Sequence, residues 1–333
     1  MLRLRQWGTD IVYPLPSEPN GELIVGTDEA CALRLDDPRV SHQHAALAWR
    51  RGGWHLRDLG SKNGLWRDGA RHAGFLVAPG IEIKIGRTIL IPESQDLIDL
   101  LAFLARILGW GADRREAVDM ALRSIRAASV RRHELVLLGE GDLVPVAFAI
   151  HQRTLGDRPF VVSDPRRADA EESVRSVANR PNAQDAYTAA AGGSLCVRSS
   201  RLPASFSSVL PQLRRPDSRV QLIVCAGDRS GSDRFLAPPV RIPPLRDRQA
   251  ELARIVEEYA LEAERDLKVR PGSVDRGWVL EHATGLADIE KAARRSAALH
   301  NSASVGAAAI LLGMQHVSLT RWLRRRGGGD IEL

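Results

Sequence analysis

The chain has 333 residues, of which 26% are charged and 44% hydrophobic, and its formal net charge is +6. One hydrophobic core seldom organises so long a chain, so we expect two or three domains. No apolar run is long enough to span a bilayer, and residues 1–7 lack the apolar core of a signal peptide, which predicts a cytoplasmic protein. The 3 cysteines, Cys31, Cys196 and Cys225, are widely spaced and predict buried hydrophobic side chains, with neither disulfides nor a metal site.

Residues 1–94 contain short apolar or alternating runs separated by Gly, Pro, Asn and Asp. The runs lie at residues 23–25, 45–49, 54–56 and 81–85. Asn63-Gly64 and Asp68-Gly69 are turn signals of the kind found in hairpins. This pattern predicts a compact all-β domain of many short strands.

A change to helical periodicity follows at residues 95–130. Leucines recur at helical spacing from Leu97 to Leu108, glycines interrupt the run, and a second apolar stripe extends from Ala117 to Ile125. We interpret residues 95–112 as a helical linker or dimerisation element. A helix that packs onto its own domain is an equally good interpretation.

Two motifs of the first domain resemble those of the forkhead-associated (FHA) domain. They are the segment Ser41-His42-Gln43-His44-Ala45 and the turn Asp58-Leu59-Gly60-Ser61-Lys62-Asn63-Gly64, preceded at the family's spacing by Gly26. The resemblance implies a β-sandwich that binds a phosphothreonine peptide in its loops. A phosphothreonine carries almost two negative charges, so its site needs hydrogen-bond donors and cations.

The resemblance also implies a role for each matching residue. Ser41 and the Ser61-Lys62 pair would hold the phosphate, and Asn63 would bind the peptide backbone beside it. Structural roles fall to Gly26, His44 and Gly64. The chain departs from the family in having Thr27 and His42 where arginines are usual, so we expect weaker binding, with His42 in the site making it depend on pH near neutrality.

From Leu135 onward, the chain resembles the AAA+ domain of NtrC-like, sigma-54-dependent activators. The resemblance rests on segments in the family's order, at residues 136–140, 147–151, 158–162, 186–195, 218–226 and 241–248. It implies an α/β core at residues 113–240 and a helical lid at residues 241–300.

The residues that ATP hydrolysis requires are missing from this AAA+-like region. The loop at residues 139–145 has no Lys, Ser or Thr for the phosphates and Mg²⁺, and Arg198-Ser199 replaces the expected Asp-Glu pair. The sigma-54-gripping motif is absent between residues 165 and 185, the arginine-finger segment is reduced to residues 233–238, and residues 287–290 lack a sensor arginine. We therefore expect no enzyme activity and no cofactor.

The last part of the chain, residues 301–333, resembles the Fis-type helix-turn-helix end of the same activators. A small-residue helix at 305–314, a turn at 315–317 and a basic helix at 318–326 have the spacing of this motif. Leu319 and Leu323 would pack inward. The residues that would face DNA are an N-cap serine and its polar and basic neighbours: Ser318, Thr320, Arg321, Arg324 and Arg325. The alternative is a solvated basic helix that closes the lid.

Together these features predict a multidomain bacterial regulator: an all-β FHA sandwich, a catalytically inactive AAA+-like α/β core with a helical lid, and a helix-turn-helix. It would bind a phosphothreonine-containing protein and DNA, and regulate transcription. A homo-oligomer remains open. The alternative is a phosphopeptide-binding adaptor in Ser/Thr kinase signalling that does not bind DNA.

Overall fold

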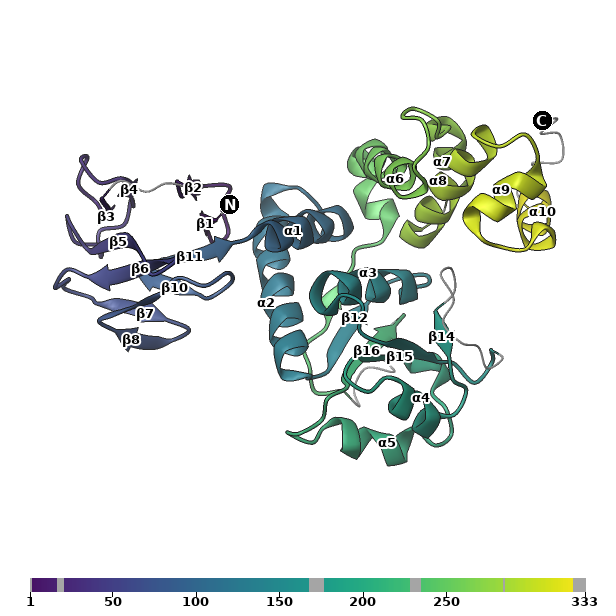
Figure 1. Cartoon of the computed structure of the whole chain (residues 1–333), viewed down its shortest axis with the longest axis horizontal. Coiled ribbons are helices and arrows are strands. Elements are labelled where there is room, and N and C mark those ends of the chain that lie inside the picture. Colours follow the sequence, from purple (N-terminus) through teal and green to yellow (C-terminus); the bar gives the residue numbers. More distant parts are fainter. Residues whose placement is uncertain (1, 17–20, 168–176, 228–234, 284, 326–333) are drawn as a thin grey trace. The chain divides into compact units, whose positions relative to one another are not determined.

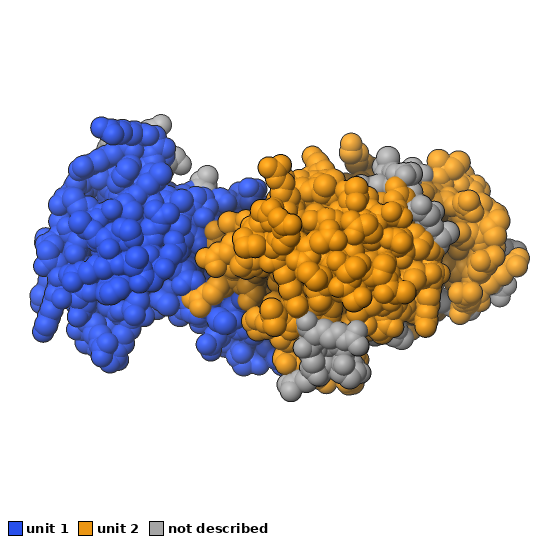
Figure 2. Space-filling view, turned by 90° about the horizontal axis from the view of Figure 1, so that it is seen from below, with its two compact units in different colours: residues 1–105, 111–120 blue, residues 106–110, 121–333 orange. Residues whose placement is uncertain are grey.

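The structure, a computed structural model, describes residues 2–16, 21–167, 177–227, 235–283 and 285–325. The chain forms two compact units, which Figure 2 colours separately. Unit 1 contains Met1–Ala105 and Gly111–Met120, and unit 2 contains Arg106–Trp110 and Ala121–Leu333. The boundaries predicted at residues 94 and 112 do not coincide with these limits.

Unit 1 contains a β-sandwich of two sheets, as its alternating apolar runs predict (Figure 1). Across the first sheet the strands are β2 (Val12–Pro14), β1 (Arg3–Gln6), β11 (Thr88–Glu93), β10 (Ile83–Ile85), β7 (Leu65–Arg67) and β8 (Ala70–His72). Across the second sheet they are β4 (Leu33–Arg34), β3 (Glu22–Gly26), β5 (Ala45–Arg50), β6 (Gly53–Asp58) and β9 (Gly74–Leu76). Apolar side chains such as Leu47, Leu65 and Ile83 form the core of the sandwich.

Two hairpins of the sandwich close with left-handed, two-residue turns. Residues 51–52 join β5 to β6, and Asp68-Gly69 joins β7 to β8 with φ values of 48° and 86°. A positive φ at both positions matches the twist of the strands, which confirms the Asp68-Gly69 prediction. Asn63-Gly64 is not a hairpin turn, because β6 and β7 belong to different sheets. It carries the chain from one sheet to the other.

Unit 1 extends beyond the sandwich to the beginning of α2 (Arg115–Arg131), which follows α1 (Gln95–Leu108). Arg5 of β1 is buried; its Nε donates to the Glu93 carboxylate (2.6 Å) and its Nη1 to the Asp119 carboxylate (3.0 Å). Burial would lower the pKa of Arg5, but the hydrogen bonds and charges of both carboxylates raise it above its ordinary value. Asp119 also accepts the Gly8 N–H at 2.7 Å, so a residue of α2 helps to hold β1 in place.

Unit 2 contains a parallel sheet whose first strand in the chain, β12, lies next to the edge strand β17. The strand order is β14 (Ala178–Asn179), β13 (Phe160–Ser163), β15 (Ser194–Arg198), β16 (Gln221–Ala226), β12 (Leu135–Leu138) and β17 (Val240–Arg241). The chain leaves β12 for β13 on one side and later returns to β17 on the other. Parallel strands covered on both faces are near-continuous apolar runs, and β12 and β16 are buried along their whole length.

Helices cover both faces of this sheet (Figure 1). On one face, His151 of α3 (Val144–Leu155) is 2.8 Å from the Ser194 hydroxyl, and its ring packs 5.1 Å from that of Phe160. On the other face, α4 (Ala183–Ala189) and α5 (Phe206–Leu213) share a core with Val197 and Val224. Val197 lies three residues after Ser194 in β15, so its side chain points to the face opposite that of Ser194. The predicted α/β region is therefore present.

The remainder of unit 2 is helical. After a 3-10 segment at Leu245–Glu251 come α6 (Leu252–Leu267), α7 (Arg276–His282), α8 (Leu286–His300), α9 (Val305–Leu312) and α10 (His316–Arg324). Helices α6, α7 and α8 share one apolar core, and α9 and α10 form a second with the end of α8. The segment Arg106–Trp110 belongs to this unit, because Trp110 donates its backbone N–H to Glu251 (2.8 Å) and Arg248 donates to the Arg106 carbonyl (2.9 Å).

Within the described ranges, no helix has both the length and the apolar character needed to cross a membrane. The same ranges contain no cluster of His, Cys, Asp or Glu side chains suited to a metal ion. Cys196 and Cys225 are buried, as predicted, whereas Cys31 is only half-buried because it lies in a surface loop, where its thiol donates to the His42 carbonyl at 3.2 Å.

Candidate functional site

Two loops of the sandwich bring Ser41, Lys62 and Asn63 together. One loop leads from β4 into β5, and the other connects β6 to β7. The Lys62 backbone N–H donates to the Ser41 hydroxyl at 3.3 Å, and the Asn63 side-chain amide donates to the Arg39 carbonyl at 2.6 Å. The Lys62 and Asn63 side chains are exposed and Ser41 is half-buried. The three residues therefore face solvent from adjoining loops.

His44 connects the same two loops from below. It is fully buried; its Nδ1 accepts the Ser41 N–H at 3.1 Å, and its Nε2 lies 3.1 Å from the Gly64 carbonyl. Because Nδ1 faces a donor and Nε2 faces an acceptor, these partners assign the tautomer with hydrogen on Nε2. Both partners are backbone groups, so His44 fixes the main chain of each loop.

Gly26 and Ser61 shape the loops from the inside. A Cβ on Gly26 would collide with the His42 carbonyl oxygen, so only glycine fits there. Ser61 is buried at 8% exposure, its hydroxyl accepts the Gly64 N–H at 3.0 Å, and its own N–H donates to Asp58 at 2.9 Å. Ser61 thus lies within its turn and not beside Lys62 on the surface. A contact between Ser61 and a phosphate stays a prediction.

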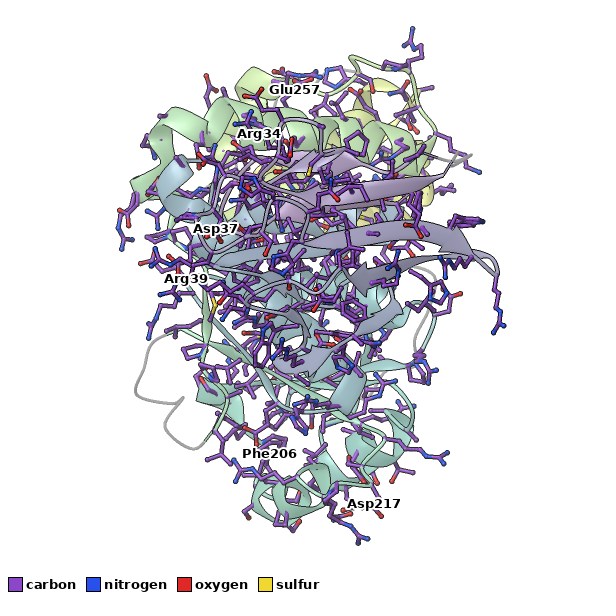
Figure 3. All side chains as sticks on the ribbon, turned by 90° about the vertical axis from the view of Figure 1, so that its left-hand side faces the viewer. Arg34, Asp37, Arg39, Phe206, Asp217 and Glu257 are labelled. Atoms are coloured by element: carbon purple, nitrogen blue, oxygen red, sulfur yellow. The ribbon has the colours of Figure 1, made fainter. Side chains whose placement is uncertain are left out.

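Asp37 anchors the loop that carries Ser41, a role that the sequence motifs do not predict. Its buried carboxylate accepts the backbone N–H groups of Arg39 (2.9 Å) and Thr88 (3.0 Å), among others. Burial alone would raise the pKa of Asp37, but these hydrogen bonds outweigh it and lower the pKa below its ordinary value. Asp followed by Pro and then Arg is a turn signal that could have identified this anchor. Figure 3 shows Asp37 and Arg39 near one another.

The two positions without the family's arginines contribute backbone contacts. Thr27 donates its N–H to the Ser41 carbonyl, and Asp28 donates to the His42 carbonyl, both at 3.2 Å. His42 is exposed. Thr27 carries no charge, so it cannot contribute positive charge beside Ser41. Lys62, whose backbone N–H donates to the Ser41 hydroxyl, is a cationic residue that can. Hydroxyl, amide and ammonium groups on a fixed backbone can hold a phosphate monoester and a peptide strand.

A family model described as "FHA domain" matches residues 23–86, which include both loops. The N-terminal sandwich is an FHA domain. FHA domains bind phosphothreonine peptides of partner proteins.

Two similar proteins are both called FHA domain-containing protein FhaB. The protein of Mycolicibacterium smegmatis is 33% identical over 72 residues, which are 21% of this chain and 46% of the relative. That of Mycobacterium tuberculosis is 33% identical over 69 residues, 20% of this chain and 44% of the relative. The chain thus spans a little under half the length of the curated relatives it matches.

Two solved structures are also similar to part of this chain. The FhaA FHA domain, solved in complex with an intracellular domain, is 28% identical, with 28% of this chain and 100% of that chain covered and a TM-score of 0.26. Mycobacterium tuberculosis EmbR, solved with a low-affinity phosphopeptide, is 22% identical, with 28% and 24% covered and a TM-score of 0.26.

A second candidate site lies in unit 2, at the carboxyl ends of β12, β13 and β15. Arg198 donates to Asp142, in the loop after β12, and to Asp164, after β13, both at 2.9 Å. Burial would raise the pKa of Asp142, but the charge and hydrogen bond of Arg198 lower it. A crevice of about 330 Å³ adjoins this ion-pair network. Ligands of parallel α/β sheets bind at this edge.

The charges in the crevice are opposite to those of a nucleotide site. The Asp142 carboxylate accepts the Val144 N–H at 3.2 Å, so a protein carboxylate occupies the position at the beginning of α3 where a phosphate would bind. Arg198, the last residue of β15, adds a cation that cannot bind Mg²⁺. Parts of the predicted sigma-54-gripping loop (residues 168–176) and of the arginine-finger segment (residues 233–234) lie outside the described residues.

The C-terminal helices α9 and α10 form the third candidate site. Helix α9 ends at Gly313, which has a φ of 62°, and α10 begins at His316 after the N-cap Gln315. The prediction of Ser318 as the N-cap is therefore wrong: the extended backbone of Gln315 ends the turn earlier, and Ser318 lies in the first turn of α10, exposed. Leu319 is buried, as predicted, and so is Leu323.

Polar and basic residues gather on the exposed side of α10. Thr320 is half-buried and donates its hydroxyl to the His316 carbonyl at 3.1 Å. Arg321, Arg324 and Arg325 are exposed and line a hollow of about 470 Å³ with Thr320 and His316. Helix α10 ends at Arg324 with Arg325 as its C-cap, so the predicted helix end at residue 326 is wrong. This face can meet an anionic surface.

Proposed function

We propose that this protein is a phosphothreonine-dependent transcriptional regulator. Its FHA domain would bind a phosphorylated protein, and its C-terminal helices would bind DNA. The observation that carries the proposal is the cluster of Ser41, Lys62 and Asn63 on loops held by buried His44. A hydroxyl, a cation and an amide so arranged match the phosphate and backbone of a phosphothreonine peptide.

The α/β part of unit 2 would serve as a scaffold without ATPase activity. Its segments resemble the AAA+ core of sigma-54-dependent activators, but Asp142 and Arg198 have the wrong charges for a nucleotide and its metal. Because they pair with one another at 2.9 Å, binding ATP would require breaking a partly buried ion pair as well as overcoming repulsion by Asp142.

The proposed contact with DNA rests on α10. Two exposed arginines of a short helix and a third directly after it, with Leu319 and Leu323 packed against α9, are typical of a helix-turn-helix. The rival is an adaptor in kinase signalling that binds only proteins. Two large apolar side chains favour it, because Ile310 of α9 is 73% exposed and Val317 of α10 is 60% exposed.

Fluorescence anisotropy with a phosphothreonine peptide and its unphosphorylated twin tests the phosphate-reading role. Ser41→Ala should lower affinity at least tenfold, because it removes a hydrogen bond to the charged phosphate worth about 1.5–3 kcal/mol. Asn63→Ala removes a neutral hydrogen bond to the peptide backbone worth about 0.5–1.5 kcal/mol and should lower affinity about twofold to tenfold. Ser41→Thr keeps the hydroxyl and should retain most of the binding. Equal affinity for both peptides, or binding that survives both alanine changes, would contradict the proposal.

A mobility-shift assay on genomic fragments with salt titration separates the regulator from the adaptor. The triple change Arg321→Ala, Arg324→Ala and Arg325→Ala should weaken binding and flatten its salt slope by about one unit for each DNA phosphate that no longer has an arginine partner. The change Arg265→Ala and Arg270→Ala removes exposed charges elsewhere in unit 2 and serves as the control. No binding by the wild type at low salt would favour the adaptor.

A further inference from the structure

Two exposed arginines without an assigned role, Arg39 and Arg71, lie next to Asn63 in the FHA domain. The Arg39 carbonyl accepts the Asn63 side-chain amide at 2.6 Å. The Arg71 guanidinium lies against the backbone of Gly64, where it would collide with any Cβ. Both arginines therefore adjoin the residue that is proposed to hold the peptide backbone.

The backbones of both arginines are fixed, while their charged groups are available. Arg39 is held through its N–H by buried Asp37, and Arg71 pairs with Trp66 across the β7–β8 hairpin. Among the described residues, neither guanidinium has a hydrogen-bond or ion-pair partner, whereas other exposed arginines of the sandwich such as Arg50 and Arg57 pair with Glu22. An unpaired guanidinium that extends from a fixed backbone beside a binding site can pair with a carboxylate of a bound peptide.

We propose that this site selects a phosphothreonine peptide with acidic residues on either side of the phosphothreonine. The inference rests on the proposed phosphopeptide function and adds the class of ligand. Ser41 and Lys62 take the phosphate, and Asn63 takes the adjoining backbone. Arg39 and Arg71, next to Asn63, then face the side chains that neighbour the phosphothreonine. Carboxylates at those positions give each guanidinium a partner.

The departures from the family make the ion pairs of Arg39 and Arg71 more important for affinity. Thr27 and His42 replace two arginines that the family usually has near the phosphate, so less of the affinity comes from the phosphate itself. Ion pairs with flanking carboxylates recover part of that affinity. They also make the site selective among phosphopeptides, because neutral or basic flanking residues leave both guanidinium groups without a carboxylate to pair with.

Four peptides test the inference on the full chain: threonine or phosphothreonine, each flanked on both sides by two aspartates or by two alanines. Two exposed ion pairs should make the wild type bind the acidic phosphopeptide about threefold to tenfold more tightly than the alanine one, and 0.5 M salt should remove most of this preference. The double change Arg39→Gln and Arg71→Gln should abolish the preference while the alanine phosphopeptide still binds.

Arg51→Gln is the matched control. It removes an exposed arginine in the turn at the far end of β5 from Ser41, and it should leave the preference unchanged. The reversal Arg39→Glu and Arg71→Glu should favour lysine-flanked phosphopeptides. Equal binding of acidic and alanine phosphopeptides by the wild type, or a preference that persists in the double variant, would overturn the inference alone. Failure to distinguish phosphorylated from unphosphorylated peptides would overturn the proposed function as well.

Discussion

Removing the Asp119 carboxylate should destabilise unit 1 far more than removing an ordinary surface charge. Arg5 and Asp119 are 7% and 1% exposed in their side chains, and Glu93 is fully buried. Asp119→Ala leaves the Arg5 guanidinium with one carboxylate and the Gly8 N–H without its acceptor. Losing one partner of a buried ion pair costs about 3–5 kcal/mol. Because Glu93 still neutralises Arg5, we expect about 3 kcal/mol.

Native-state hydrogen exchange of β1 and β11 amides, followed against urea, measures this destabilisation in unit 1 alone. Asp10→Ala is the control: it removes the partner of Arg115 from an ion pair whose side chains are 74% and 37% exposed, and should cost less than about 1 kcal/mol. Asp119→Asn keeps an acceptor for Gly8 and should fall between the two. If Asp119→Ala costs no more than Asp10→Ala, the role of α2 in the fold of unit 1 is refuted.

Four further outcomes are expected. Millimolar ATP should not raise the melting temperature and no hydrolysis should occur; saturable stabilisation would contradict the pairing of Asp142 with Arg198. Gly26→Ala should displace the His42 backbone and weaken phosphopeptide binding, which amide chemical shifts and anisotropy can follow. Leu319→Asp should abolish DNA binding by unfolding α10, measured by helical circular dichroism and mobility shift, while phosphopeptide affinity stays at the wild-type value. The pKa of Asp37 is lower in the folded state, so its contribution to the free energy of unfolding is complete above its unfolded pKa of about 4 and is lost as pH falls from there through the folded-state pKa. Asp37→Asn should therefore be less stable than the wild type at pH 7 and lose less stability on acidification, as urea unfolding at each pH can measure.

Local patterns predicted the strands and turns that depend on neighbouring residues. Short apolar or alternating runs identified the sandwich strands β3, β5, β6 and β10. Asp68-Gly69 was identifiable because a positive φ at two successive positions restricts the residue types. The helical stripe that contains Leu319 and Leu323 predicted which side chains of α10 are buried. In each case the residues that carry the prediction lie within a short stretch of the chain.

Features that depend on distant residues were not predictable in this way. Arg5 and Asp119 are 114 positions apart, so no periodicity connects them. Arg71 comes to lie against Gly64 only through the register of β8 on β7. Ser61 has the residue type of a surface phosphate ligand, but its hydroxyl turns inward because the Gly64 N–H needs an acceptor. The sequence shows that Asp142 and Arg198 stand in segments that lack the residues ATP hydrolysis requires. Only the fold shows that these two side chains form an ion pair.

The loops of the FHA domain have hydrogen-bond partners of their own without any ligand. His44, Asp37 and the Asn63 amide hold their main chain through hydrogen bonds that do not involve a peptide. The entropy of ordering the site is therefore spent during folding, and a peptide has only its own freedom to lose on binding. Encounter should be fast and independent of loop closure, so partners should differ mainly in how long they remain bound. A phosphorylated partner could therefore be bound without waiting for a loop to move, and the lifetime of the complex would set how long the signal lasts.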